Sequence, residues 1–369
     1  MTTVTDAYGF TAYGGPDVER FLDLPLPSPG PGELLIEVHA AGVNPVDWKV
    51  REGMHRSFLP LGLPAVFGRE AAGVVVELGP GVGGFAVGDA VFGSSARGCG
   101  GYATHAVLTT DFTTPKPEGL SFTDAAALPV AAGTAYDSVN GLAMTTGETL
   151  LILGAGGGVG VAAAQLAASE GVSVVGTASR AKRDFVASLG ATPVPYDSDD
   201  TADRLATALP KGADAVLDLV GGDALDTVSA LMSPGCRVLT VADPDTAARF
   251  GARPLSRGNR AQTLRELARR VQDGRLHPHV REIFPFAEAP SALRAVETGH
   301  PWGKVVLEMR TGPRSAAECP RSSSSRRRRG LPGHPWPEGC ARRGPGSAWT
   351  TRARTSPASA VPGDPATSR

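Results

Sequence analysis

The stretch of sequence that decides the fold is TLLILGAGGGVGVAAAQLA, residues 149–167. It predicts a buried strand over Thr149–Leu153, a glycine-rich turn over Gly154–Gly160 and a helix behind the turn. Glycines let the backbone approach an anion closely, and the start of a helix offers that anion free N–H groups and a favourable dipole. The stretch therefore predicts a site for the phosphates of a dinucleotide.

The glycines of this turn follow the spacing Gly154-x-x-Gly157-x-x-Gly160, because Val159 stands where the commoner GxGxxG pattern has its third glycine. A glycine-rich turn by itself can be a plain structural turn. Here a strand precedes it, a helix follows it and strands alternate with helices downstream, which favours dinucleotide binding. The residues expected to contact the cofactor at the turn are Gly154, Gly157, Gly158, Val159 and Gly160.

Short apolar strands alternate with helix-like segments from about Ser121 to Ala242. The strands are expected at Leu150–Leu153, Val172–Gly176, Ala215–Leu219 and Arg237–Val241, and the helices at Val159–Ser169, Lys182–Leu189 and Ala224–Met232. This alternation predicts an α/β fold, with a Rossmann-type doubly wound parallel sheet that carries helices on both faces.

The end of the strand after the turn indicates which dinucleotide binds. NAD sites usually have an acid there, which hydrogen-bonds a ribose hydroxyl. In this chain no acid appears before Asp184, and the cluster at that place is Ser179, Arg180, Lys182 and Arg183. A hydroxyl and three cations would bind a 2′-phosphate through charge-assisted hydrogen bonds, although a solvated helix start would look the same. We therefore predict NADPH as the cofactor.

The segments on either side of this region predict β structure and a return of the chain. Leu34, Ile36 and Val38 alternate with the other residues of 33–39, as in a half-buried strand. Further elements are expected as strands over Ala71–Leu78 and Ala86–Phe92, a helix over Arg260–Gln272, a second helix carrying Phe284, Phe286, Ala289, Leu293 and Val296, and a last strand over Gly303–Leu307. We expect this last strand to rejoin the N-terminal β domain.

Charge is distributed unevenly along the chain. From Thr311 to Arg369 there are 11 arginines, no lysine and 3 acids, so this tail carries a net charge of +8 and residues 1–310 carry −9. An acidic globular part argues against a nucleic-acid partner. The tail is rich in proline, glycine and serine, and we expect it to be disordered, although a basic RNA-binding arm would have a similar composition.

Composition and cysteine usage exclude several other classes. Hydrophobic residues make up 41% of the chain and charged residues 20%, which is typical of a soluble globular protein. No basic segment leads into an apolar run at the N-terminus, and no apolar run approaches the roughly 20 residues of a membrane helix. We therefore expect a cytoplasmic protein with no signal peptide and no membrane partner. The four cysteines form no CxxC pair, which predicts isolated thiols rather than a structural zinc site. No GxSxG motif supports a hydrolase.

The chain resembles the zinc-independent quinone oxidoreductase branch of the medium-chain dehydrogenases and reductases. The resemblance covers nearly all of residues 8–309 and is specific for the family, though not for a substrate. The motifs that carry it are AGVNPVD at Ala41–Asp47, GREAAG at Gly68–Gly73, VGDAV at Val87–Val91, GGYA at Gly100–Ala103, LPVAAGTA at Leu128–Ala135, the glycine turn, LGA at Leu189–Ala191 and GKVV at Gly303–Val306.

The resemblance implies a GroES-like β-barrel, which is split in sequence and completed by the C-terminal segment. The implied division is 1–124 for the first part of this substrate domain, 125–256 for the NADP-binding Rossmann domain, 257–310 for the return to the substrate domain and 311–369 for the tail. It also implies a homodimer formed by edge-strand pairing.

Several single residues acquire implied roles from the same resemblance. Asn44 is placed like the family residue near the nicotinamide ribose, and Thr134 like the residue beside the nicotinamide and the phosphates. Tyr196 resembles a tyrosine that helps to hold the 2′-phosphate. Val220 and Val241 are placed like residues that line the nicotinamide pocket.

Zinc-dependent relatives carry a cysteine near position 44 and a histidine at the place of Arg69, and this chain has neither. The resemblance therefore implies no metal and hydride transfer from NADPH to an activated small molecule, a quinone or an α,β-unsaturated carbonyl. Trp48 and Lys49 occupy the stretch in which some relatives have a tyrosine, which leaves the proton donor open between side chains such as Asp47 or Lys49 and water. The residues expected at the catalytic centre are Asn44, Asp47, Lys49 and Thr134.

Two other functions fit the same sequence. One is an enoyl reductase of a biosynthetic pathway, which acts on a thioester or a natural-product intermediate. The other is a protein that binds NADPH without catalysis. Turnover of NADPH with a panel of quinones and enones would separate these possibilities.

Overall fold

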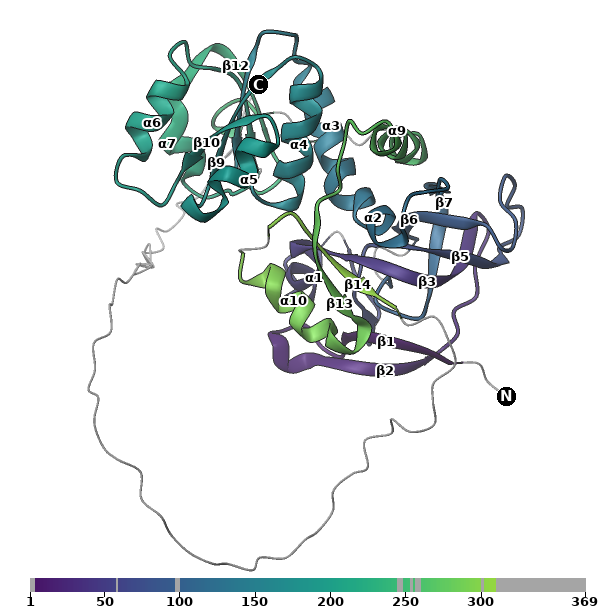
Figure 1. Ribbon diagram of the computed structural model, residues 1–369. Helices are drawn as coiled ribbons and strands as arrows, with labels where there is room; N and C mark the ends of the chain where they lie inside the picture. Colours follow the sequence, from purple (N-terminus) through teal and green to yellow (C-terminus); the bar gives the residue numbers. More distant parts are fainter. Residues whose placement is uncertain are drawn as a thin grey trace, which may run out of the picture. The chain divides into compact units, whose positions relative to one another are not determined.

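The parallel sheet predicted around the glycine turn is present in the computed structural model of the chain (Figure 1). Its strands are ordered β10-β9-β8-β11-β12, and all of them pair in parallel. Their bounds are β8 (Thr149–Leu153), β9 (Ser173–Ala178), β10 (Ala191–Pro195), β11 (Ala213–Asp218) and β12 (Met232–Thr240). The strand before the glycine turn, β8, lies where the strand order reverses, and ligands of open parallel sheets bind at such points.

The structure describes residues 4–57, 59–96, 100–243, 248–252, 255, 260–299 and 302–309. The tail predicted to be disordered lies outside these residues, and so do Cys99, Cys319 and Cys340. Cys236 is described and is a free thiol, and burial raises its pKa to about 11.

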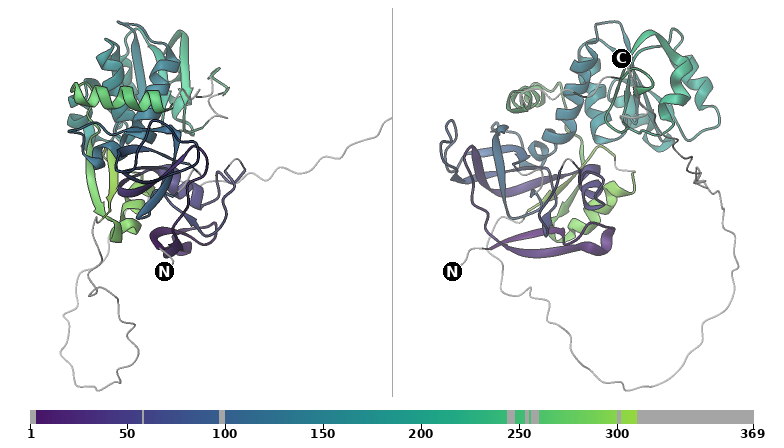
Figure 2. Two further views of the ribbon diagram at one scale, coloured as in Figure 1. Left: turned by 90° about the vertical axis from the view of Figure 1, so that its right-hand side faces the viewer. Right: turned by 180° about the vertical axis from the view of Figure 1, so that it is seen from behind.

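Helices cover both faces of the parallel sheet and form a core with each face. Each strand contributes to both cores, because successive residues of a strand point to opposite sides. Leu150 and Ile152 of β8 pack in one core with α4 (Gly158–Ser169). Leu151 and Leu153 pack in a second core with α6 (Thr201–Ala208) and α7 (Ala224–Val228). The helices α3 (Gly133–Leu142) and α5 (Arg183–Ser188) belong to the side of α4 (Figure 2). The doubly wound fold is thus confirmed.

Two parts of this region differ from the prediction. The strand β10 and the helix α6 carry no clear signal in the sequence, because Pro193 and Pro195 interrupt the strand pattern. Proline lacks a backbone N–H, and β10 tolerates two of them because it lies at the edge of the sheet. The segment predicted as a helix up to Met232 is instead divided into α7, a 3-10 turn over Ser229–Leu231 and the start of β12.

The N-terminal region is the β-barrel that the resemblance implies, and its strands pair antiparallel except for β13 and β14, which pair in parallel. One sheet has the order β13-β14-β3-β5-β6-β7, and it closes because β3 pairs with both β5 and β7. A second sheet has the order β2-β1-β4. The strands are β1 (Val4–Phe10), β2 (Glu19–Pro25), β3 (Glu33–Val43), β4 (Ala65–Val66), β5 (Glu70–Leu78), β6 (Ala90–Ser95), β7 (His105–Pro115), β13 (Val280–Pro285) and β14 (Lys304–Glu308). The strand β14 pairs antiparallel with β3, so the chain returns to the barrel as expected (Figure 1).

Local departures from the predicted pattern have identifiable causes. The alternation over 33–39 predicts an exposed Leu35, but this side chain is buried together with Leu34 and Ile36. A register shift between Leu35 and Ile36 interrupts the alternation there. The last predicted helix is α10 (Ala289–Glu297), and it begins after Phe284 and Phe286, which lie in β13 and in a 3-10 turn. This region also contains two short helices, α1 (Pro45–Arg51) and α2 (Phe122–Ala126), and a 3-10 turn over Pro16–Val18. A π-helical turn over Leu128–Ala132 connects α2 to α3.

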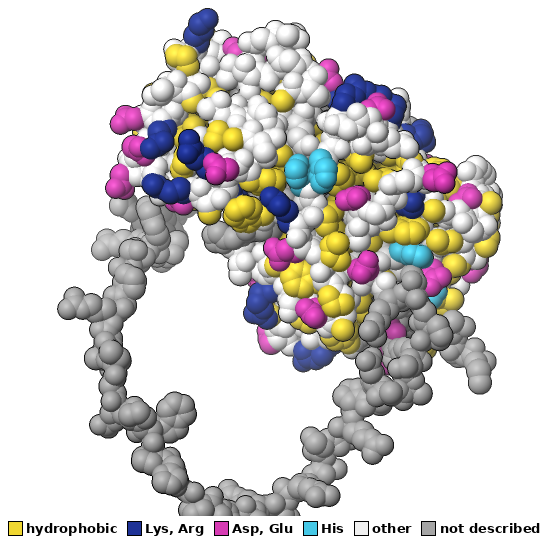
Figure 3. All heavy atoms as spheres, in the orientation of Figure 1, with side chains coloured by type: hydrophobic (Ala, Val, Ile, Leu, Met, Phe, Trp, Pro, Cys, Tyr) yellow, Lys and Arg dark blue, Asp and Glu magenta, His cyan; other side chains and the backbone are white. Residues whose placement is uncertain are grey.

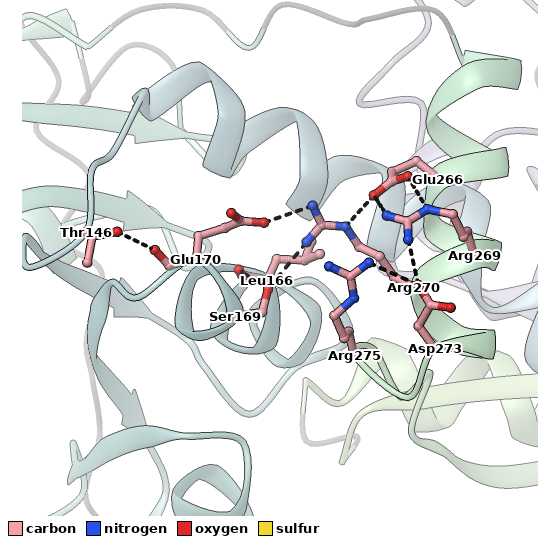
Figure 4. Close-up of polar contacts among 9 residues, drawn as sticks. All are labelled: Thr146, Leu166, Ser169, Glu170, Glu266, Arg269, Arg270, Asp273 and Arg275. Carbon is pink, nitrogen blue, oxygen red and sulfur yellow. Dashed lines mark hydrogen bonds and ion pairs between the residues drawn. The ribbon is translucent and has the colours of Figure 1, made fainter.

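The helix α9 (Arg260–Gln272) is held against the end of α4 by Arg270 (Figure 4). The guanidinium donates to Glu170 Oε1 at 2.9 Å and to Ser169 Oγ at 3.3 Å, and its Nε donates to Glu266 Oε1 at 2.8 Å. Leu264 and Leu267 of α9 are buried in the core that contains α4. Packing joins α9 to the region of the parallel sheet, and α9 also contacts β7 of the barrel. The division of the chain after residue 256 therefore stays a proposal.

We expect Arg270→Ala to lower the free energy of unfolding by about 1–2 kcal/mol, because it removes charge-assisted hydrogen bonds from a side chain that is mostly buried. Urea unfolding followed by circular dichroism measures this loss. The matched control is Arg269→Ala on the same helix, whose exposed side chain pairs only within α9 and the residue after it. Equal losses in both variants would show that the contact with α4 contributes nothing.

The described surface carries charges of both signs. On the face drawn in Figure 3, Lys and Arg side chains are interspersed with Asp and Glu side chains, unlike the basic stripe of a nucleic-acid interface. Within the described residues, no helix combines the length and the apolar character needed to cross a membrane.

Candidate functional site

The glycine turn connects the end of β8 to the start of α4 with a conformation that only glycine adopts freely. Gly154 has φ of +91°, and its N–H donates to Thr177 Oγ1 of β9 at 3.1 Å. Gly157 caps α4, and the first bond within the helix runs from Val161 N–H to Gly157 O at 2.9 Å. The N–H groups of the first helical residues, 158–160, have no acceptor within the helix. The sequence predicts that these N–H groups bind an anion, and their position at the start of α4 is compatible with that prediction.

Close packing requires a glycine at position 160 of the turn but not at position 157. A Cβ on Gly160 would collide with Gly154 O and lie 2.6 Å from Ala155 Cα, so this position brings the helix against the preceding strand. A Cβ on Gly157 would meet only Gly154 O, at 3.8 Å. The turn is therefore closed at Gly160 and open at Gly157, which leaves room for a ligand at the helix cap.

The cationic cluster predicted after β9 is divided between a buried and an exposed part. Lys182 is only 8% exposed, and its stem crosses the turn, with Cδ 2.6 Å from where a Cβ on Gly156 would lie. Burial lowers the pKa of Lys182. Arg180 and Arg183 are exposed, and Ser179 is half-buried at the start of the short 3-10 turn. Of the four residues of this cluster, Lys182 is thus the one whose side chain lies directly against the glycine turn.

Tyr196 lies beside this cluster, and its neighbour Asp197 is an acid that sequence reasoning missed. The Tyr196 N–H donates to Ala178 O at 3.0 Å, and its side chain is 56% exposed. Asp197 Oδ1 accepts a hydrogen bond from the Arg180 N–H at 2.8 Å. The prediction considered acids only at the end of β9, whereas Asp197 reaches the cluster from the end of β10, a strand that was itself not predicted.

Asn44 belongs to a buried polar network that the sequence did not reveal. Its Nδ2 donates to Glu70 Oε1 at 2.7 Å, and its Oδ1 accepts from Lys304 Nζ at 2.7 Å. Lys304 Nζ also binds Glu70 Oε1 at 2.8 Å, and Glu70 Oε2 accepts from the Val130 N–H at 2.6 Å. Glu70 and Lys304 appear in the GREAAG and GKVV motifs, but nothing in those motifs shows that the two side chains meet.

Asp47 and Lys49 occupy different environments on α1. Asp47 Oδ2 accepts from the Asn44 N–H at 2.9 Å and from the Tyr102 hydroxyl at 2.8 Å, and the side chain is buried. It caps the start of α1, which argues against the predicted role of Asp47 as proton donor. Lys49 is half-buried, and its ammonium lies 5.7 Å from the centre of the Trp48 ring.

Burial raises the pKa of Asp47 to about 6, against the opposing hydrogen bonds from Asn44 and Tyr102. A raised pKa in the folded state means that stability is full below the unfolded value of 3.8 and falls as the pH rises to about 6. Asp47→Asn keeps a hydrogen-bond acceptor but does not ionise. We expect its stability relative to the parent protein to increase by about 2 kcal/mol between pH 4 and pH 7. Urea unfolding of both proteins at the two pH values tests this, and a constant difference would contradict it.

The remaining predicted residues lie at the ends of strands and at the start of α3. Thr134 is 5% exposed in the first turn of α3. Val220 lies two residues after the end of β11, and Val241 directly follows the end of β12. Both side chains are exposed. Val220 lies against the turn, with Cγ2 3.2 Å from where a Cβ on Gly154 would be. Asp218 holds this loop, because its Oδ1 accepts from the Val220 N–H at 2.9 Å.

The described part of the candidate site contains no cluster of metal ligands. Among the described residues, no group of three or more His, Cys, Asp or Glu side chains has an arrangement that could hold a metal ion. Asn44 is committed to Lys304 and Glu70, and Arg69 is a cation that cannot act as a ligand. The zinc-free character of the site stays a proposal.

Comparisons with known proteins agree with this geometry. The model for the alcohol dehydrogenase GroES-like domain matches residues 30–118, and the model for zinc-binding dehydrogenases matches residues 189–307. The chloroplast envelope quinone oxidoreductase homolog of Arabidopsis thaliana is 31% identical over 322 residues, which cover 82% of this chain and 98% of that protein. The chain belongs to the medium-chain dehydrogenase/reductase family.

Two further members of this family extend the comparison. The 2-methylene-furan-3-one reductase of Solanum lycopersicum is 32% identical over 314 residues, 82% of this chain and 78% of that protein. The structure of the quinone oxidoreductase from Coxiella burnetii superposes with a TM-score of 0.77 at 32% identity, and it covers 84% of this chain and 100% of its own. The chain is thus a medium-chain oxidoreductase with quinone oxidoreductase-like relatives, and the family uses a nicotinamide cofactor.

Proposed function

We propose that this medium-chain oxidoreductase is a zinc-free, NADPH-dependent reductase of quinones or α,β-unsaturated carbonyl compounds. The observation that carries the proposal is the glycine turn, which is open at Gly157 and backed by the buried Lys182. The helix N-terminus and the lysine together supply positive potential for phosphates. The named relatives include quinone oxidoreductases and the reductase of a conjugated ketone, which supports this acceptor class.

The residues of the turn and its surroundings fit a nicotinamide dinucleotide. The N–H groups of residues 158–160 would hold the pyrophosphate, and Lys182, Ser179 and Tyr196 would hold the 2′-phosphate. Asn44 and Thr134 would lie by the nicotinamide end, and Val220 and Val241 would line its pocket. When bound, NADPH supplies the hydride, so the protein has to position the acceptor and exclude water.

Protonation of the reduced product falls to Lys49 or to water. Asp47 Oδ2 accepts from the Asn44 N–H and from the Tyr102 hydroxyl, and Asp47 Oδ1 is buried, so neither oxygen is open to a substrate. Lys49 lies two residues further along the same helix and is half-buried. Its ammonium carries a transferable proton.

The preference for NADPH over NADH depends on the balance between Lys182 and Asp197. Asp197→Asn removes a negative charge near the proposed 2′-phosphate site and keeps the acceptor for the Arg180 N–H. We expect this variant to bind NADPH about three- to tenfold more tightly while NADH affinity stays the same. Fluorescence titration with both cofactors measures the change. A parallel gain for NADH would place Asp197 away from the phosphate.

The acceptor class is tested by NADPH oxidation with the full chain. The panel contains a benzoquinone, an alkyl vinyl ketone, an enoyl thioester and, in the oxidative direction with NADP⁺, a simple alcohol. We expect turnover with the quinone or the vinyl ketone and none with the alcohol. Turnover with the thioester alone would support a biosynthetic enoyl reductase instead, and tight NADPH binding without any turnover would refute the enzyme assignment.

Assembly into a homodimer is part of the same proposal. The strand β12 lies at an edge of the parallel sheet among the described strands, so its outer side can pair with a second copy. Light scattering at working concentration tests this, and the mass of a single 37.8 kDa chain would contradict it.

A further inference from the structure

The buried pair of Lys304 and Glu70 lies where the barrel, the segment Leu128–Ala132 before α3 and the glycine turn come together. We infer that both are positioning residues that orient the amide of Asn44 toward the nicotinamide ribose. This inference rests on the proposed function. It assigns a task to two charged side chains that take no part in the chemistry themselves.

The charges around Asn44 decide how its amide is turned. A cation, Lys304 Nζ, lies 2.7 Å from Oδ1, and a carboxylate oxygen of Glu70 lies 2.7 Å from Nδ2. Turning the amide over would bring its NH₂ group against the ammonium and its carbonyl oxygen against the carboxylate. Both contacts would be repulsive in a buried site, where electrostatic interactions are stronger than in water. The pair therefore selects one of the two amide orientations.

The orientation leaves a defined hydrogen-bonding capacity for a ligand. The Oδ1 atom has two lone pairs: Lys304 uses one of them, and the Asp47 N–H faces the other in the capping box of α1. One N–H of the amide donates to Glu70, and the other has only a long contact of 3.4 Å to Gly42 O. This second N–H can thus donate to the oxygen of a sugar hydroxyl. The donor would be lost if the amide were free to turn.

The same pair connects the amide to the parts of the site that hold the cofactor. Glu70 is fully buried and accepts from the Val130 N–H at 2.6 Å, four residues before Thr134. Lys304 is 4% exposed, and its Cδ lies 2.9 Å from where a Cβ on Gly158, the first residue of α4, would be. The Lys304 side chain therefore spans from the phosphate end of the proposed site to the ribose end.

The test separates the nicotinamide half of the cofactor from the adenosine half. In the full chain, Lys304→Met/Glu70→Gln removes both charges together, so that neither is left buried alone. We expect the Kd for NADPH to rise about tenfold, whereas the Kd for adenosine 2′,5′-bisphosphate, which lacks the nicotinamide ribose, should change by less than about twofold. Asn44→Ala should show the same selective loss, and adding it to the double variant should produce no further loss.

Two control variants, Lys304→Arg and Lys211→Met, accompany this test. Lys304→Arg should retain the ion pair and the fold but displace the charge. We expect a smaller loss of affinity, selective for NADPH. This variant replaces the double variant if the double variant does not fold. Lys211→Met removes an exposed lysine and should change neither Kd. Equal losses for both ligands, or no loss for either, would overturn the positioning role. If the parent protein binds neither ligand, the proposed function itself fails, and this inference fails with it.

Discussion

Replacing Gly160 by alanine should destabilise the nucleotide region by about 3 kcal/mol and abolish measurable NADPH binding. The new Cβ would collide with Gly154 O and lie 2.6 Å from Ala155 Cα, and both are backbone atoms that cannot move independently of β8. Relief of the collision requires α4 to shift away from the strand, which displaces the N–H groups at its start. Thermal unfolding and fluorescence titration with NADPH measure the two effects.

The matched control is Gly157→Ala in the same turn. Gly157 has φ of −92°, which alanine adopts without strain, and the nearest atom to the new Cβ would be 3.8 Å away. We expect the melting temperature to stay the same but NADPH affinity to fall about tenfold, because the methyl group occupies the space proposed for the pyrophosphate. Unchanged NADPH affinity in Gly157→Ala would place the phosphates elsewhere.

Replacing Arg51 by methionine should destabilise the barrel by about 3–5 kcal/mol, because it leaves buried carboxylates without their partner. The guanidinium is fully buried, pairs with Glu19 of β2 and donates to Glu297 Oε1 of α10 at 2.7 Å. Its Nε donates to Gly14 O at 3.0 Å. One side chain thus fastens the C-terminal helix to the N-terminal sheet, and chemical unfolding of the full chain should report its loss.

An exposed ion pair provides the comparison for Arg51. Arg204 pairs with Asp200 within one helix turn at 2.7 Å, and about half of each side chain is exposed. Arg204→Met should leave the unfolding midpoint unchanged within error, because solvent screens such pairs. If Arg51→Met cost no more than Arg204→Met, the return of the chain to the barrel would depend on strand pairing and on the apolar packing of α10.

The nucleotide fold was predictable because its signals are local. The run Thr149–Leu153, the glycine spacing and the following helix lie within one short segment, and each element supports the same interpretation. The strand β10 was missed for the opposite reason, because its two prolines contradict the pattern locally and only its place at the sheet edge makes them acceptable.

The polar network at the candidate site could not be predicted, because its members meet only after folding. Glu70 and Lys304 are separated by 234 positions in the chain, and no periodicity connects them. Lys182 likewise resembles its exposed neighbours Arg180 and Arg183 in sequence, yet it is buried across the glycine turn. Tertiary packing, rather than residue type, decides which cation contacts the turn.

We propose that the turn over Gly154–Gly160 holds the phosphates of NADPH, and an equilibrium titration of the parent protein is the most direct test. Calorimetric titration with NADPH and with NADH, under the same conditions, measures both dissociation constants. We expect saturable one-to-one binding of NADPH, at least about tenfold tighter than that of NADH, because Lys182 favours the additional phosphate. Failure of both cofactors to bind would contradict the account, and equal affinities would contradict its assignment of the 2′-phosphate site.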